Sequence, residues 1–223
     1  MSTGNSHAHA DHAHHFESAE HEYLSGKEGV WLFLTTEILM FGGLFVAYIL
    51  FKNLYPQVFH DGGKLLDWRL GGLNTIVLLT SSLTMALSIH YVQKGKNSQA
   101  IACLWITLIC AAAFMVVKYF EYSHKIHMGT LPNKFFHLHE ELPSELGEVP
   151  KNLALFFGLY FVMTGLHGIH VLVGMGLIYW MIVRTKRGDF HPKKYTALEG
   201  VGLYWHLVDL IWIYLFPLLY LVS

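Results

Sequence analysis

Five long apolar runs, separated by polar stretches, limit most strongly what this sequence can fold into. They cover about Val30–Phe51, Gly71–Val92, Ala100–Tyr119, Asn152–Val183 and Gly202–Val222. A helix of 22 residues is about 33 Å long, enough to cross a hydrocarbon core of about 30 Å. Only 14% of the residues are charged, whereas soluble domains average about 25%. Because backbone polar groups must be hydrogen-bonded within a bilayer, these runs predict an all-α membrane protein, a bundle of five transmembrane helices.

The basic residues between the runs predict how the bundle is oriented. Two short connections on one side carry seven of them: Lys94, Lys96, Arg184, Lys186, Arg187, Lys193 and Lys194. Basic residues concentrate in short cytoplasmic loops. We therefore expect a cytoplasmic N-terminus and a periplasmic C-terminus. The long connection around residues 127–152 is then periplasmic, and we expect some local structure in it.

The segment 1–27 differs in character from the membrane domain expected over 28–223. It is polar and contains six histidines, so we expect a flexible cytoplasmic tail without a core of its own. Imidazoles bind Cu²⁺ and Zn²⁺, but a low-complexity tract does not by itself predict a specific metal site. The segment lacks a basic region before an apolar core, so no cleavable signal is expected. A net charge of −1 gives no basic face for nucleic acid.

Glu37 lies eight residues into the first apolar run and is the most unusual side chain there. An ionised carboxylate at the centre of a membrane helix costs about 2.5–3.5 kcal/mol on insertion scales. It should therefore face protein or water. Two interpretations follow: a functional carboxylate, in a proton path or against a neighbouring subunit, or a protonated helix–helix hydrogen bond.

Other polar residues in or beside the runs have plainer interpretations. His206, Asp209 and Trp212 follow one another at intervals of three in the last run, and the first two are predicted to hydrogen-bond each other. Glu121, three residues after Lys118, is expected in an interfacial ion pair. His90 is predicted to contact headgroups or a loop.

The stretch "TGLHGIHVLVG" places His167 and His170 three residues apart on one helical face. Two histidines on one face cannot bind a haem iron axially from both sides. A metal would need further ligands, for which the other runs offer no companion set beyond His206 and the acids. We therefore expect no metal here, and predict that both histidines are interhelical or lipid-facing hydrogen-bonding groups.

Five segments, taken in order, resemble subunit III of the haem–copper terminal oxidases. They are "WLFLTTEILMFGGLF", "LNTIVLLTSS", "KYFEY", "TGLHGIHVLVG" and "LEGVGLYWHLVDLIW". The matching residues are Glu37, Asn74, Glu121, Tyr122, His167, His170, Glu199, Trp205, His206, Asp209 and Trp212. The resemblance covers about residues 28–222. Many members have seven helices, and five-helix versions, as expected here, are known in bacterial cytochrome c and quinol oxidases.

The resemblance implies a subunit without redox centres in the inner membrane of a bacterium. Haem and copper would lie in a partner, subunit I, with subunit II and a small subunit IV also in the complex. The chain would pack beside subunit I, bind phospholipid and sustain proton uptake during O₂ reduction by an aa3-type cytochrome c oxidase. Glu37 would be the functional carboxylate. Arg187 and Lys193 are expected to contact lipid headgroups, because anionic headgroups attract Lys and Arg near the membrane.

Other functions remain open at this point. The chain resembles subunit III of quinol oxidases and an accessory protein of nitric oxide reductase systems. A stand-alone proton or ion transporter would use Glu37, Asp209 and the histidines as a relay. The electron donor, the bound lipids and membership of a larger respiratory assembly are not encoded in these motifs.

Overall fold

The computed structural model describes residues 19–130, 152–190 and 195–221, and these residues form long helices. The helices are α1 (Ala19–Leu54), α3 (Trp68–Gln93), α4 (Asn97–His127), α5 (Leu153–Arg187) and α6 (Thr196–Phe216), together with a short α2 (Pro56–Lys64). A π-helical segment, η2 (Pro217–Leu221), continues α6. Five of these are long and apolar enough to cross a membrane, with α6 and η2 forming a single span. The prediction of an all-α, five-helix membrane protein is confirmed.

The first helix begins earlier than the apolar pattern indicates. It starts at Ala19, so residues 19–27, which we expect to be part of a flexible tail, belong to α1. The rest of that tail lies outside the described residues, as does most of the long connection, residues 131–151. Apolarity marks the part of a helix that lipid contacts, whereas backbone hydrogen bonding continues beyond it into the interface.

Two short elements are not expected from the sequence. Helix α2 begins with Pro56 at its first position, where a missing N–H costs nothing, and packs against α5 and η2. At Gly62 a β-carbon would clash with the ring of Phe156 on α5, so this close approach needs glycine. At the other end of the chain, Pro217 begins the π-helical segment, which brings Tyr220 into the core.

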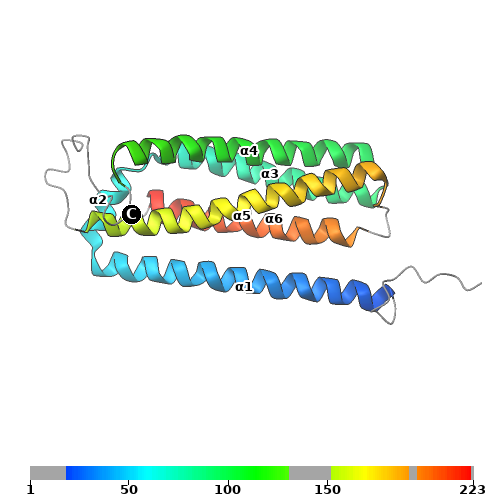
Figure 1. Ribbon diagram of the computed structural model, residues 1–223, viewed down its shortest axis with the longest axis horizontal. Coiled ribbons are helices and arrows are strands. Elements are labelled where there is room, and N and C mark those ends of the chain that lie inside the picture. Colours follow the sequence, from blue (N-terminus) through cyan, green and yellow to red (C-terminus); the bar gives the residue numbers. More distant parts are fainter. Residues whose placement is uncertain (1–18, 131–151, 191–194, 222–223) are drawn as a thin grey trace, which may run out of the picture.

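The helices pack as an antiparallel bundle in which α1 is set apart (Figure 1). α3 and α4 pack along one side, and α5 and α6 lie between them and α1. α6 is the most buried of the five spans and α1 the least. The beginnings of α1, α4 and α6 lie at one end of the bundle, and α2 lies at the opposite end with η2 (Figure 1).

Small hydroxyl side chains join the inner helices. Thr84 of α3 and Thr107 of α4 are hydrogen-bonded at 2.7 Å, and Ser81 accepts a hydrogen bond from the Trp205 indole of α6 at 3.1 Å. Gly174 of α5 admits the Trp205 ring so closely that a β-carbon would clash with it. Small residues and hydroxyls are the usual means by which membrane helices approach one another, because water does not drive apolar faces together there.

Candidate functional site

The most distinctive polar contact joins the outlying helix α1 to the bundle. Glu37 Oε2 of α1 lies 2.8 Å from His170 Nε2 of α5. The two side chains are 15% and 14% exposed, respectively. The structure thus brings together two residues that the sequence singles out separately, and confirms that His170 hydrogen-bonds across helices.

The second ring nitrogen of His170 determines which protons this pair holds. Nδ1 lies 2.7 Å from the backbone carbonyl of Leu166, which can only accept, so Nδ1 carries a hydrogen. The contact with Glu37 therefore contains one further proton: a protonated carboxyl donates to a neutral imidazole, or an imidazolium donates to a carboxylate. Both forms have no net charge. This explains how a carboxyl group is accommodated inside an apolar helix.

Aromatic side chains surround the pair and hold it in place. The ring of Phe41 meets His170 edge-on, with 5.3 Å between the centroids. Tyr204 of α6 donates its hydroxyl hydrogen to the carbonyl oxygen of His170 at 2.9 Å. The pair therefore joins α1 to α5, and Tyr204 joins α5 to α6 at the same level.

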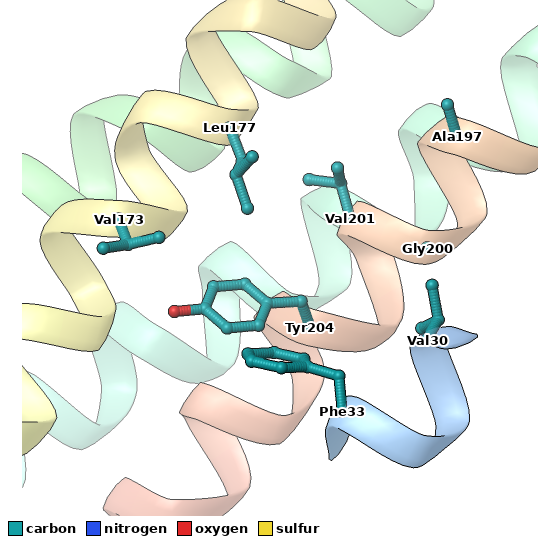
Figure 2. Close-up of a pocket in the computed structure, with 8 residues that line it drawn as sticks. All are labelled: Val30, Phe33, Val173, Leu177, Ala197, Gly200, Val201 and Tyr204. Atoms are coloured by element: carbon teal, nitrogen blue, oxygen red, sulfur yellow. The ribbon is translucent and has the colours of Figure 1, made fainter. Parts of the chain in front are cut away.

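A narrow apolar groove of about 250 Å³ lies between α1, α5 and α6 (Figure 2). Val30 and Phe33 of α1 form one wall, and Leu177 of α5 and Val201 of α6 lie across from them. The Tyr204 ring lines this groove, with 6.0 Å between its centroid and that of Phe33, while its hydroxyl group binds His170. Tyr204 thus lies between this apolar groove and the backbone of His170.

His167 behaves differently from His170, and the prediction of a hydrogen-bonding role for it is wrong. Its side chain is fully buried, and neither ring nitrogen has a hydrogen-bond partner within the described part of the chain. It packs between the rings of Phe114 and Trp212, with centroids at 5.6 and 5.4 Å. Because residues three apart differ by about 60° around a helix axis, one histidine points into the bundle and the other toward α1.

A second polar cluster lies near the α2 end of the bundle. Lys118 Nζ is 2.9 Å from Glu121 Oε2, and Glu121 Oε1 accepts hydrogen bonds from Tyr160, at 2.7 Å, and from Tyr220. Both charged side chains are almost fully buried. The structure contains the expected ion pair, and rings from α5, α6 and η2 cover it within the bundle.

The Lys118 ammonium group also faces aromatic rings. Its Nζ lies 4.9 Å from the Trp212 centroid, 5.4 Å from that of Tyr160 and 5.6 Å from that of Tyr220. Cation–π attraction adds to the ion pair in such a desolvated site. The sequence gives little sign of this arrangement, because tyrosines near helix ends suggest only an interfacial aromatic belt.

The prediction that His206 and Asp209 bind each other is wrong. His206 Nδ1 lies 2.7 Å from Ser82 Oγ of α3 instead. Asp209 is buried, and neither carboxylate oxygen has a hydrogen-bond partner among the residues that the structure describes. The side-chain amide of Asn74 is also buried and likewise has no hydrogen-bond partner among the described residues. Trp212 does form a polar contact, since its indole N–H donates to Thr75 Oγ1 at 3.1 Å.

The remaining predicted positions lie near the ends of the helices. His90 is exposed in the last turn of α3, and Glu199 is half-buried in the first turn of α6. Arg187 is exposed at the end of α5, while the nearby Arg184 binds Asp189 at 3.1 Å and lies over the Trp180 ring. Lys193 lies outside the described residues.

The described residues contain no group of three or more His, Cys, Asp and Glu side chains that could hold a metal ion. What they do contain is a membrane bundle with a hydrogen-bonded Glu–His pair between two helices and a buried Lys–Glu–Tyr cluster. This combination defines a multi-pass membrane protein with two sets of hydrogen-bonded ionisable groups, one between α1 and α5 and one near the α2 end of the bundle.

Comparison with known proteins gives the family. The chain matches the family described as Cytochrome c oxidase subunit III over residues 10–136 and 152–223. It is 32% identical over 214 residues to cytochrome c oxidase subunit 3 of Thermostichus vulcanus, covering 96% of this chain and 92% of that one. It is 27% identical over 219 residues to quinol oxidase subunit 3 of Bacillus subtilis, covering 96% and 97%. The chain belongs to the cytochrome c oxidase subunit III family.

A third relative is a larger protein. Over 202 residues the chain is 26% identical to the heme-copper oxidase subunit I+III of Aeropyrum pernix, covering 88% of this chain and 22% of that one. The resemblance to haem–copper oxidase subunit III is therefore confirmed by family membership across the chain.

Proposed function

We propose that this chain is the non-redox subunit III of a bacterial aa3-type cytochrome c oxidase. In this role it packs beside the catalytic subunit, binds phospholipid and sustains proton uptake while O₂ is reduced to water. The observation that carries the proposal is the family match over both halves of the chain, together with near-complete coverage of single-subunit relatives.

The Aeropyrum relative supports subunit I as the direct partner. Its name places subunits I and III in one polypeptide, and this chain matches less than a quarter of it. Two subunits that are fused in one organism are expected to lie side by side in another. Subunit II and a small subunit IV complete the proposed complex, and haem and copper belong to subunit I.

A quinol oxidase is the second candidate. The Bacillus relative is a quinol oxidase subunit with the same coverage of this chain, although its identity of 27% is below the 32% to the Thermostichus protein. The identities favour cytochrome c as the electron donor. Oxidation of reduced cytochrome c, and not of a quinol, by the purified complex tests this choice.

The Glu37–His170 pair is the proposed proton-related site of the subunit. It holds one proton in a 2.8 Å contact and exchanges between two forms without a change in net charge. The net charge of such a pair changes only when it takes up a further proton or loses the proton that it shares. In proton uptake, the pair serves as a proton-bearing group held in a fixed position near subunit I. Its hydrogen bond also holds α1 against α5.

Lipid contact is proposed at the basic end of α5. Arg184 lies over the Trp180 ring and binds Asp189, whereas Arg187, the last residue of α5, is exposed. Arg187, with Lys193 in the following connection, is the proposed headgroup contact, since anionic headgroups attract such residues. The groove beside Tyr204 offers an apolar space of matching chemistry for an acyl chain.

Purification of this chain from native membranes tests the proposal. We expect a haem-bearing subunit to co-purify, and we expect removal of this chain to leave the haem optical spectrum intact while activity decays faster during turnover. Loss of haem in proportion to this chain would overturn the assignment of a non-redox role. Proton or ion transport by the purified chain alone in liposomes would favour the transporter alternative.

A further inference from the structure

A second cavity lies at the end of the bundle that carries α2. It has a volume of about 330 Å³ and is bounded by the α2–α3 connection and the last turns of α4. Unlike the groove beside Tyr204, it is lined by ionisable side chains: Lys64, Asp67, Glu121, His124 and Lys125. The positive-inside rule predicts that this end is periplasmic.

The two carboxylates at this cavity are already engaged by the protein. Asp67 caps helix α3 and accepts the backbone N–H of Arg69 at 2.9 Å. Glu121 accepts hydrogen bonds from Lys118 and from two tyrosines. The charge of Glu121 is therefore opposed by Lys118, whereas the exposed Asp67 keeps its negative charge at the cavity's edge.

The basic groups are less completely engaged. Lys125 is 4% exposed and donates to the carbonyl oxygen of Leu65, which accounts for one of its three N–H groups. Within the described ranges no other hydrogen bond of its ammonium group is seen. Lys64 and His124 are exposed at the cavity's edge. The cavity thus has an inner buried cation and an outer pair of basic groups.

The cavity also opens toward lipid. Phe120, which is 65% exposed, and Leu70 belong to the membrane-spanning parts of α4 and α3, and both line it. A ligand that fits this cavity must therefore carry a compact anionic group, to match the basic residues, next to a hydrocarbon part that matches Phe120 and Leu70. A free anion would satisfy the lysines but would leave the apolar wall without a partner.

We propose that this cavity binds the phosphate of a glycerophospholipid headgroup. Lys125 is the inner contact to a phosphate oxygen, and Lys64 and His124 are the outer contacts. The glycerol and the first carbons of the acyl chains lie against Phe120. Charge-assisted hydrogen bonds from lysine to phosphate are strong in such partly desolvated sites. This inference rests on the lipid-binding part of the proposed function and gives it a location.

An alternative explanation is purely structural. Lys64 and Lys125 lie in the last turns of α2 and α4, where basic side chains interact favourably with helix carbonyls. If that is their whole role, substitutions will alter stability and leave lipid binding unchanged. The two explanations are therefore separable by experiment.

Native mass spectrometry of the purified complex, with phosphatidylglycerol titrated into the detergent, provides the test. Bound lipid is read on the released chain, so the result does not depend on whether a haem-bearing partner is present. Lys125→Gln should raise the apparent dissociation constant about tenfold. Lys64→Gln, which changes an exposed residue and should fold normally, should raise it about threefold. Lys94→Gln, at the other end of α3, is the matched control and should change nothing.

Two further ligands identify what is recognised. Diacylglycerol with the same acyl chains lacks the phosphate and should bind at least tenfold more weakly to the wild-type chain. Inorganic phosphate lacks the hydrocarbon and should not displace the lipid at equal concentration. Equal lipid binding by wild type, Lys64→Gln and Lys125→Gln would overturn the proposal, as would equal binding of diacylglycerol. Displacement by inorganic phosphate would show a free-anion site instead.

Discussion

Replacing Glu37 and His170 by leucine, singly and together, tests whether their contact is the neutral, proton-sharing pair described above. Glu37→Leu leaves the Nε2 atom of a largely buried imidazole without its partner, which should cost about 1–3 kcal/mol in the free energy of unfolding. His170→Leu leaves a carboxyl group without a partner in an apolar helix and should cost about 2.5–3.5 kcal/mol. Each single change also loosens α1, which is the least buried span.

The double variant is the informative one. Because it removes both polar groups, nothing remains unpaired, and its cost should fall below the sum of the two single costs by about 2 kcal/mol. The free energy of unfolding is measured by SDS titration in mixed micelles for all four proteins. Additive costs would refute the pairing, because independent residues do not compensate each other.

Glu37→Gln separates the hydrogen bond from ionisation. The glutamine amide can donate to the unprotonated Nε2 of His170, since Nδ1 keeps its hydrogen for Leu166. We therefore expect the oxidase to assemble with this variant, and its unfolding free energy to change by no more than about 1 kcal/mol. Proton uptake during turnover should decline. If this variant blocks assembly altogether, Glu37 is a structural residue and the proposed proton role is wrong.

Three other substitutions test the rest of the site. Tyr220→Phe removes a hydrogen-bond donor to the buried Glu121 and should lower the unfolding free energy by about 1–3 kcal/mol. His167→Phe should be neutral or stabilising in thermal unfolding, because the imidazole nitrogens have no partner within the described residues, whereas His170→Phe should destabilise. Gly62→Ala should cost about 1–3 kcal/mol through overpacking against the ring that faces it.

Two of these have a matched control in the same chain. Tyr119→Phe alters an exposed tyrosine next to the cluster, and Gly176→Ala adds a methyl group where nothing lies within 4 Å. Both should leave the melting temperature unchanged. Equal effects of Tyr220→Phe and Tyr119→Phe on stability would contradict the hydrogen bonds assigned to the buried cluster. A stability loss in His167→Phe as large as that in His170→Phe would contradict the different roles of the two histidines.

The sequence determines the membrane class and the number of spans by itself. Runs of about 20 apolar residues leave helices as the available backbone structure in lipid, and this needs no knowledge of how the helices pack. It also marks Glu37 as costly, since a carboxyl group in an apolar run has to find a partner wherever the helix is placed. These inferences are local, so they do not require the tertiary structure.

The tertiary structure alone decides which partner each polar group has. Glu37 meets His170 across 133 positions of sequence, and His206 turns to Ser82 instead of Asp209 because α3 packs beside α6. Spacing along one helix shows which residues share a face, but it does not show which neighbouring helix covers that face. Interhelical hydrogen bonds depend on the rotation and depth of two helices relative to each other, and both are set by packing of the whole bundle.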